Sequence, residues 1–320
     1  MLHLVKAPVA QDFTYWVDRW SFMEGTLHVS GHGFSRTRET TGVRLILADG
    51  SRVPLAGFRL PSPDATLRWG PDAAACRIEA TVPLAGGEPA AIAAQLEFVF
   101  ADGSREIVRD RSLEDAADPV TRIIETFVSM LHAMPPGHIL EVGSRNRTGD
   151  SRRGYVPDGW RYTGTDIVDG ENVDAAGDIH EASTFLPHGR FDAMMSFSVF
   201  EHLLMPWKAA VELNCLLRPG AIGLIVAPQT WPLHEEPWDY FRFSRHAWKA
   251  LFNASTGYEI IAAVDGHPAY IIARRMSAAF AWGEGYTGAL MSAALVRKTG
   301  DSRVDWPVRL RDVTQDDYPL

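Results

Sequence analysis

A short apolar stretch that ends in a glycine turn most constrains how this chain can fold. Residues 139–142 read Ile-Leu-Glu-Val, and a turn follows between Gly143 and Gly149. Such a run is typical of a buried parallel strand whose loop approaches a nucleotide-like ligand, because glycine has no Cβ and lets the backbone come close. Glu141, just before the turn, suits a ligand that carries an amine.

Further segments with the same character follow along the chain. The predicted strands are residues 161–166, 172–178, 191–198, 221–228, 258–263 and 291–298. The first two end in acids, Asp166 and Asp178. An acid at the tip of the second strand of a doubly wound sheet accepts both ribose hydroxyls, and Asp178 could accept a hydrogen bond from an adenine amino group.

The order strand, acid, strand, acid, helix, Arg-Pro-Gly, strand resembles the class I S-adenosylmethionine-dependent methyltransferases over residues 118–298. The sequences of residues 141–149, 198–203 and 230–244 resemble those of bacterial methyltransferases associated with glycan or polysaccharide biosynthesis. This resemblance implies an α/β fold with a Rossmann-like, seven-stranded, mostly parallel methyltransferase sheet. It also implies S-adenosyl-L-methionine as the cofactor and a small-molecule or glycan acceptor.

The resemblance also assigns residues to the cofactor. Glu141 and the backbone at Gly143 would hold the methionine portion, and Asp166 the ribose. The expected cofactor-binding set is Glu141, Gly143, Ser144, Asp166, Ile167, Asp178, Ile179 and Ser198. Arg145 departs from the family pattern, because many members have a second glycine there. Either the loop has a different shape or cofactor affinity is reduced.

A hydroxyl acceptor needs a base, and two histidines are candidates. His234 follows the fifth strand, on the ligand edge of such a sheet, and an imidazole exchanges protons near neutrality. Its acidic neighbours could orient it, although a surface or structural histidine is the competing interpretation. His202, near the tip of the fourth strand, is the second candidate. No metal site is predicted, because His180, His202, His234 and His246 show no short ligand spacing.

Several aromatic residues accompany these histidines. They could face a sugar or the sulfonium, or simply pack the loop: Trp231, Trp238, Tyr240 and Phe241. Residues 265–288, rich in glycine and aromatic side chains, could form a lid over the site.

The chain divides into three predicted parts. Residues 1–114 read as short strands separated by turns, which predicts an antiparallel β-sandwich accessory domain whose function the sequence does not indicate. Residues 115–300 form the methyltransferase domain, opened by a helix capped at Asp118 and Pro119. Residues 301–320 form a C-terminal tail that could dock on the surface. The expected strands of the first domain are 27–30, 43–48, 52–60, 77–84, 93–100 and 105–109.

Composition excludes several classes of function. A net charge of −9 over 320 residues argues against a nucleic-acid partner. Cys76 and Cys215, the two cysteines, lie in apolar stretches and are expected to be buried thiols in a reducing cytoplasm. No signal-peptide core or membrane-spanning run is expected. The sequence leaves the oligomeric state open.

Three functions compete. The leading one is a methyltransferase that O-methylates a sugar or glycan-linked acceptor. A catalytically silent S-adenosylmethionine-binding or scaffold protein in polysaccharide assembly is the alternative, which Arg145 keeps open. A nicotinamide-dependent sugar-modifying enzyme is disfavoured, because the G-x-G-x-x-G fingerprint and a Tyr-x-x-x-Lys pair are missing.

Overall fold

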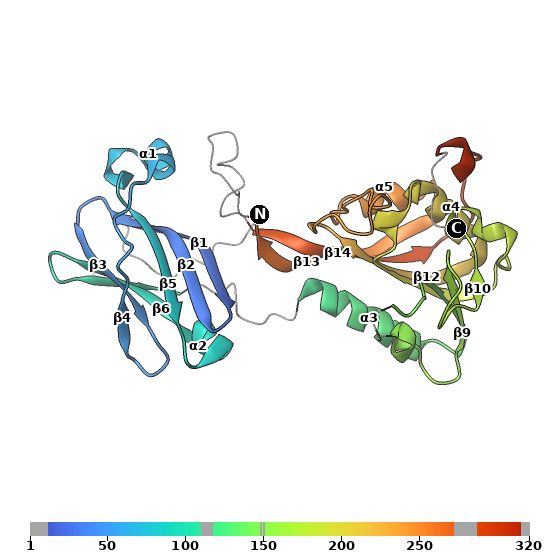
Figure 1. Ribbon diagram of the computed structural model, residues 1–320, viewed down its shortest axis with the longest axis horizontal. Coiled ribbons are helices and arrows are strands. Elements are labelled where there is room, and N and C mark those ends of the chain that lie inside the picture. The colour runs from blue at the N-terminus through green and yellow to red at the C-terminus, as the bar shows by residue number, and fades with distance from the viewer. Residues whose placement is uncertain (1–11, 110–117, 148, 150, 272–286, 315–320) are drawn as a thin grey trace. The chain divides into compact units, whose positions relative to one another are not determined.

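A computed structural model describes residues 12–109, 118–147, 149, 151–271 and 287–314. The chain separates into two compact units close to Asp115. Among the described residues, 12–109 belong to the first unit, and 118–269 with 287–314 belong to the second. Each unit has its own layers of secondary structure (Figure 1).

The first unit contains two antiparallel sheets. One has the order β1-β2-β5, with β1 (Phe13–Met23), β2 (Thr26–Ser35) and β5 (Arg77–Pro83). The other has the order β4-β3-β6-β7, with β4 (Arg52–Pro54), β3 (Thr40–Ile46), β6 (Gln95–Phe100) and β7 (Arg105–Val108). Buried side chains from both sheets share one hydrophobic cluster, with Leu27, Leu45 and Phe98 among its members. Antiparallel sheets are therefore confirmed for this part of the chain.

Several elements of the first unit differ from the sequence-based expectation. The strand β1 was not predicted, and the expected strand 52–60 is only β4. The chain also forms short helices where none was predicted, namely α1 (Pro63–Trp69), η1 (Pro71–Ala73) and α2 (Gly87–Ala93). Along β1 only Phe13 and Trp20 are buried, so the strand lacks the alternation by which strands are recognised. Trp20 fills the core and donates its indole N–H to the Ala91 carbonyl oxygen at 3.1 Å.

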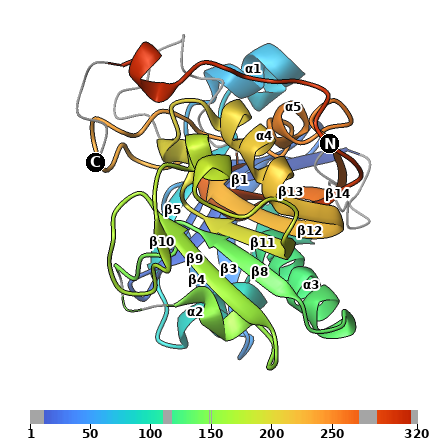
Figure 2. The ribbon, with the colours of Figure 1, turned by 90° about the vertical axis from the view of Figure 1, so that its right-hand side faces the viewer.

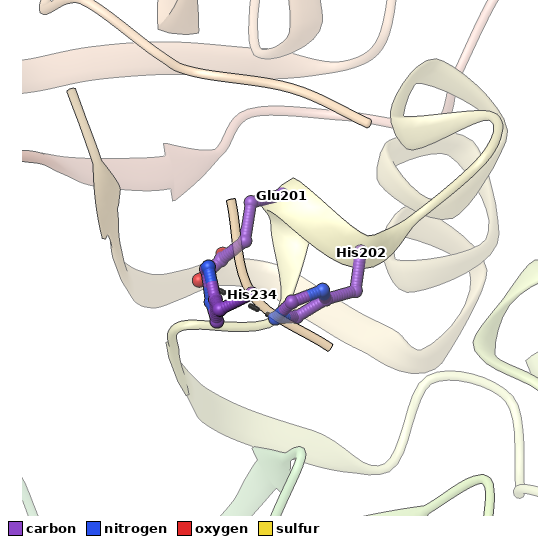
Figure 3. Close-up of side chains that lie close together, drawn as sticks. All are labelled: Glu201, His202 and His234. Carbon is purple, nitrogen blue, oxygen red and sulfur yellow. Dashed lines mark ion pairs between the residues drawn. The ribbon is translucent and has the colours of Figure 1, made fainter. Parts of the chain in front are cut away.

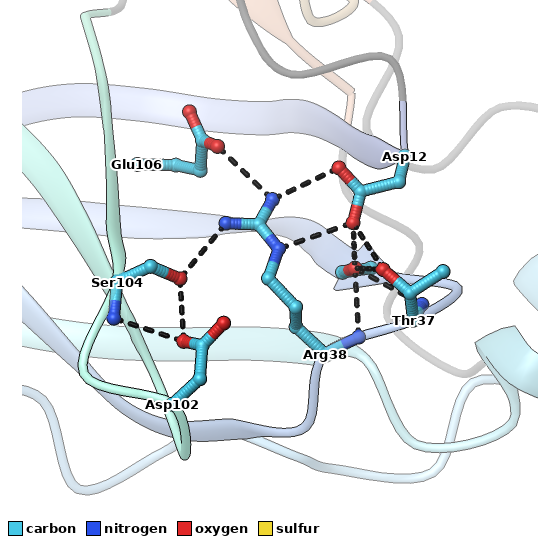
Figure 4. A network of polar contacts seen from close by, with 7 residues as sticks. Asp12, Thr37, Arg38, Asp102, Ser104 and Glu106 are labelled. Carbon is cyan, nitrogen blue, oxygen red and sulfur yellow. Dashed lines mark hydrogen bonds and ion pairs between the residues drawn. The ribbon is translucent and has the colours of Figure 1, made fainter.

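A polar network joins the end of β2 to the β6–β7 hairpin (Figure 4). One carboxylate oxygen of Asp12 accepts hydrogen bonds from the hydroxyls of Ser35 and Thr37, both at 2.6 Å, and from Arg38 Nε at 3.1 Å. Arg38 also pairs with Glu106 at 3.0 Å. These donors, the two hydroxyls first, hold the pKa of Asp12 well below its usual range.

The second unit is built on a seven-stranded, mostly parallel sheet, as predicted. Its strand order is β10-β9-β8-β11-β12-β14-β13. The strands are β8 (His138–Val142), β9 (Arg161–Asp166), β10 (Ala175–Ala176), β11 (Phe191–Phe197), β12 (Leu217–Pro228), β13 (Tyr258–Tyr270) and β14 (Thr287–Lys298). Strands β8 to β12 are paired in parallel, and β14 runs antiparallel to β12. In chain order, β9 and β10 are added on one side of β8, and β11 and β12 on its other side. A topological switch point therefore lies between β8 and β11.

Helices cover both faces of this sheet (Figure 2). The predicted first helix is confirmed as α3 (Pro119–Ala133), whose N-cap Asp118 accepts from the backbone N–H of Val120 at 2.8 Å. Phe127 and Leu131 of α3 are buried in a cluster with strand residues of one face. On the other face, α4 (Pro206–Leu216) and α5 (Trp248–Leu251) are buried in a second cluster.

Other predicted boundaries in this unit were wrong. The expected strand 172–178 is reduced to β10. The expected lid, 265–288, lies in part on β13 and β14, and its residues 272–286 are outside the described residues. Short turns of 3-10 helix complete the unit, namely η2 (Arg152–Tyr155), η3 (Ile179–Thr184), η4 (Phe200–His202) and η5 (Leu310–Asp312).

The two cysteines differ from one another. Cys76 is buried as expected, but Cys215 is exposed because it lies at an outward-facing position of α4, between buried Asn214 and Leu216.

The described part of the C-terminal tail contacts α4, since Lys208 donates to the Trp306 carbonyl oxygen at 2.9 Å. Among the described residues, no helix is both long and apolar enough to cross a membrane.

Candidate functional site

A cavity of about 510 Å³ opens at the switch point of the sheet. Its walls come from the segments that follow β8, β9, β10 and β11, because the carboxyl ends of parallel strands share one edge. All eight residues predicted to bind the cofactor line it, namely Glu141, Gly143, Ser144, Asp166, Ile167, Asp178, Ile179 and Ser198. The structure thus brings together residues that four separate segments of the sequence contribute.

The turn after β8 requires glycine at its first position. Gly143 has a φ of 76°, in the left-handed region, and its N–H donates to the Thr165 carbonyl oxygen at 2.8 Å. A Cβ added at Gly143 would lie 2.1 Å from the Val199 Cγ2 atom. The missing side chain therefore lets the β8 loop pass close to the segment that follows β11.

Glu141 is fixed at the floor of the cavity. Its side chain is buried, and Oε2 accepts a 2.6 Å hydrogen bond from the Tyr162 hydroxyl, which itself accepts from Asn172 Nδ2 at 2.8 Å. Burial raises the pKa of Glu141, and the hydrogen bond from Tyr162 opposes that rise. Burial and the neighbouring Glu141 also raise the pKa of Tyr162, so its hydroxyl stays a donor. Such a carboxylate in a poorly solvated site favours a cationic partner.

Arg145 lies directly against the carboxylate of Asp166. Asp166 Oδ1 accepts from the Val168 N–H at 3.0 Å, and Oδ2 accepts from the Arg145 backbone N–H at 3.4 Å. The Arg145 Nε atom lies 3.8 Å from Asp166 Oδ1. The residue that departs from the family pattern therefore faces the acid expected to bind a ribose.

Asp178 caps the short helix η3 and lines the same cavity. Its Oδ1 atom accepts from the backbone N–H of His180 at 2.9 Å and lies 2.7 Å from His180 Nδ1. Met205 N–H donates to His180 Nε2 at 3.2 Å, so the ring hydrogen is on Nδ1 and points at Asp178. His180 is buried in this arrangement and orients Asp178 at the cavity wall.

The segment 229–244 folds back over η4. The backbone N–H groups of Tyr240 and Phe241 donate to the Glu201 carbonyl oxygen at 2.8 and 3.1 Å. This contact brings His234 beside His202, with their ring centroids 4.8 Å apart. The structure thus unites the two predicted base candidates, of which His202 lines the cavity directly.

Both histidines have a defined tautomer. His202 Nδ1 donates to the Trp238 carbonyl oxygen at 2.8 Å, and His234 Nδ1 lies 3.1 Å from the Asp239 carboxylate. Because these partners are acceptors, Nδ1 carries the hydrogen and Nε2 carries a lone pair. Hydrogen bonds from Arg242 hold the pKa of Asp239 well below its usual range, whereas burial lowers the pKa of His202.

Sequence reasoning missed Glu201. Its side chain is 0% exposed, and burial raises its pKa to about 8. The signal was an acid next to a histidine, between the apolar residues Phe200 and Leu203. An ionisable side chain that is buried next to a residue lining a cavity, as Glu201 is next to His202, is a candidate for a functional site.

An ion pair joins the two loops that border the cavity. Arg147, in the loop after β8, donates to Glu235 Oε1 at 2.9 Å, and both residues line the cavity. Glu235 belongs to the segment that carries His234, so the same segment contacts the predicted cofactor loop.

Comparison with known proteins yields structural neighbours. No protein-family model matches the sequence, and no curated protein matches it. The structure is similar to the CurJ carbon methyltransferase, with 16% identity, a TM-score of 0.40 and 57% of this chain covered. The alignment covers 54% of the CurJ chain, so this chain matches about half of that protein's length.

Two further solved structures are similar over the same share of the chain. One is the Burkholderia thailandensis 1,6-didemethyltoxoflavin-N1-methyltransferase with bound 1,6-didemethyltoxoflavin and S-adenosylhomocysteine, at 15% identity and a TM-score of 0.41, with 57% of this chain and 80% of that chain covered. The other is the DszA carbon methyltransferase, at 16% identity and a TM-score of 0.42, with 57% of this chain and 54% of that chain covered.

Proposed function

We propose that the second unit binds S-adenosylmethionine and transfers its methyl group to a hydroxyl of a small-molecule or glycan acceptor. One observation carries the proposal. Three carboxylates, Glu141, Asp166 and Asp178, stand at the ends of three neighbouring strands around a single cavity at the switch point. An amine, a ribose and an adenine amino group are the groups that such a row would recognise.

The residues present fit this cofactor. The buried Glu141 suits the ammonium group, and Gly143 lets the loop after β8 pack close to Val199, which also lines the cavity. Bound at this site, the cofactor supplies a methyl group on a positively charged sulfur, so the chain has little covalent chemistry to perform. The protein instead positions the two reactants and removes the proton of the acceptor hydroxyl.

His234 is our first candidate for that proton transfer, and His202 the second. The Nε2 lone pair of His234 can accept a proton, and the ionised Asp239 behind Nδ1 would stabilise the imidazolium that forms. His202 faces the cavity itself. Trp238 lines the same wall and could pack against the apolar face of a sugar ring.

A silent cofactor-binding or scaffold protein is the second candidate function. The contact between Arg145 and Asp166 favours it, because the guanidinium competes for the carboxylate that the ribose would need.

The decisive experiment is calorimetric titration with S-adenosylhomocysteine. Replacing Asp166 with alanine should weaken binding by roughly 1.5–3 kcal/mol, because a charged acceptor is lost. Asp169→Ala, an exposed aspartate in the loop after the same strand, is the matched control and should bind as the wild type does. Unchanged affinity in Asp166→Ala, or preference for a nicotinamide dinucleotide, would refute the cofactor assignment.

A labelled-methyl screen over sugar nucleotides and lipid-linked glycans then tests the reaction. Transfer to one acceptor class, lost when that hydroxyl is blocked, supports the enzyme. Tight cofactor binding without transfer to any hydroxyl acceptor would favour the silent protein.

A further inference from the structure

Glu201, His202 and His234 form a compact group beside the cavity (Figure 3). The first two lie on η4, directly after β11, and the third on the segment that folds over η4. One potential ligand atom from each residue lies within 4.8 Å of those of the other two. His202 Nε2 is 3.8 Å from Glu201 Oε1.

The buried carboxylate of Glu201 is poorly compensated by the described part of the chain. Neither of its carboxylate oxygens has a hydrogen-bond partner in the part of the chain that the structure describes, although both are buried. The nearby guanidinium of Arg242 is bound to both oxygens of Asp239, at 2.5 and 2.7 Å. A buried carboxylate without hydrogen-bond donors is costly, so this site favours an additional positively charged ligand.

The two imidazoles are oriented as metal ligands are. A ligating histidine usually donates its other ring N–H to a carboxylate or a backbone carbonyl, which fixes the tautomer and the ring. His234 does so through Asp239, and His202 through the Trp238 carbonyl oxygen. Each Nε2 atom thereby carries the lone pair that a metal ligand needs, and the carboxylate of Glu201 lies beside the two rings (Figure 3).

We propose that Glu201, His202 and His234 bind one first-row transition-metal dication. Two imidazole nitrogens and one carboxylate oxygen suit Zn²⁺, Co²⁺ or Fe²⁺ better than the hard Mg²⁺ ion. Ligand atoms that share a metal at about 2.1 Å lie roughly 3 to 4 Å apart, so the observed spacing requires small side-chain rotations. Three protein ligands leave a coordination position open, and His202 places the group at the cavity wall.

The inference goes beyond methyl transfer and does not depend on it. Metal binding can be measured without S-adenosylmethionine or an acceptor. Where a metal is bound to the Nε2 atoms, neither histidine can act as a general base. Chelation and substitution experiments therefore separate the role of metal ligand from the role of base.

The test uses the full chain, stripped with EDTA and dialysed, and titrated with Co²⁺, Zn²⁺ or Mg²⁺ in a calorimeter. We expect one Co²⁺ or Zn²⁺ per chain, visible Co²⁺ bands from nitrogen coordination, and much weaker binding of Mg²⁺. Glu201→Gln, His202→Gln and His234→Gln should each weaken Co²⁺ binding by at least about tenfold. The control His246→Gln, at an exposed histidine outside the group, should bind as the wild type does.

A second measurement covers variants that fail to fold. Anomalous diffraction at the zinc edge from wild-type crystals grown with Zn²⁺ should place the ion between the three side chains. The proposal is wrong if the stripped wild type binds neither ion, if the three Gln variants bind Co²⁺ as the wild type does, or if the zinc peak lies elsewhere.

Discussion

Arg145→Ala should strengthen cofactor binding rather than weaken it. The Arg145 Nε atom lies 3.8 Å from Asp166 Oδ1, and the two side chains are 30% and 14% exposed. A pair of this geometry and exposure contributes about 1 kcal/mol once solvent screening is included. If the ribose must displace this contact, removing the guanidinium should lower the Kd for S-adenosylhomocysteine about fivefold.

Calorimetry on four proteins measures this effect: the wild type, Arg145→Ala, Asp166→Ala and the double variant. The gain from Arg145→Ala should shrink at high salt, because ions screen the pair. It should also vanish in the Asp166→Ala background, because no carboxylate remains to be released. A higher Kd for Arg145→Ala than for the wild type would refute the reasoning, since it would mean that the guanidinium itself contacts the cofactor.

Three further outcomes are expected. His234→Ala should lower turnover by about 10²- to 10⁴-fold while S-adenosylhomocysteine affinity, measured by calorimetry, stays nearly intact; full activity would make the residue structural. Residues 1–114 expressed alone should melt cooperatively in a calorimetric scan, because their sheets share a core, and an unfolded fragment would contradict this. Asp12→Asn should lower the Tm near neutral pH, and the difference should shrink in acid. The folded-state pKa of Asp12 is depressed, so its stabilisation is present above the ordinary carboxyl range and is lost as the pH falls; a pH-independent difference in Tm would argue against the network.

That the residues proposed to bind the cofactor line one cavity could be predicted, because their signals are local. Strand β8 is a short apolar run directly followed by Gly143, and β9 ends at Asp166, so each signal is adjacent in sequence to its strand. Residues such as Glu141 and Asp166 therefore reveal their position at the sheet edge without knowledge of distant contacts. The same logic recovered α3, whose cap and apolar stripe are also local.

The group formed by η4 and the segment 229–244 could not be predicted in the same way. The grouping of Glu201 with His234 depends on the segment 229–244 folding over η4, which no local pattern encodes. The contact of Arg145 with Asp166 likewise joins two loops. In the first unit, β1 was missed because it lacks alternation, and Pro54 ends β4 where apolar residues alone suggested a longer strand.

The ion pair between Arg147 and Glu235 affects how ligands enter and leave the cavity. Both side chains are exposed, at 56% and 44%, so the pair contributes at most about 1 kcal/mol and is weakened by salt. The loop after β8 and the segment 229–244 are thus joined by a weak contact. If the proposed cofactor binds in this cavity, its exchange should accelerate as ionic strength rises, although the carboxylates proposed to bind it are unchanged.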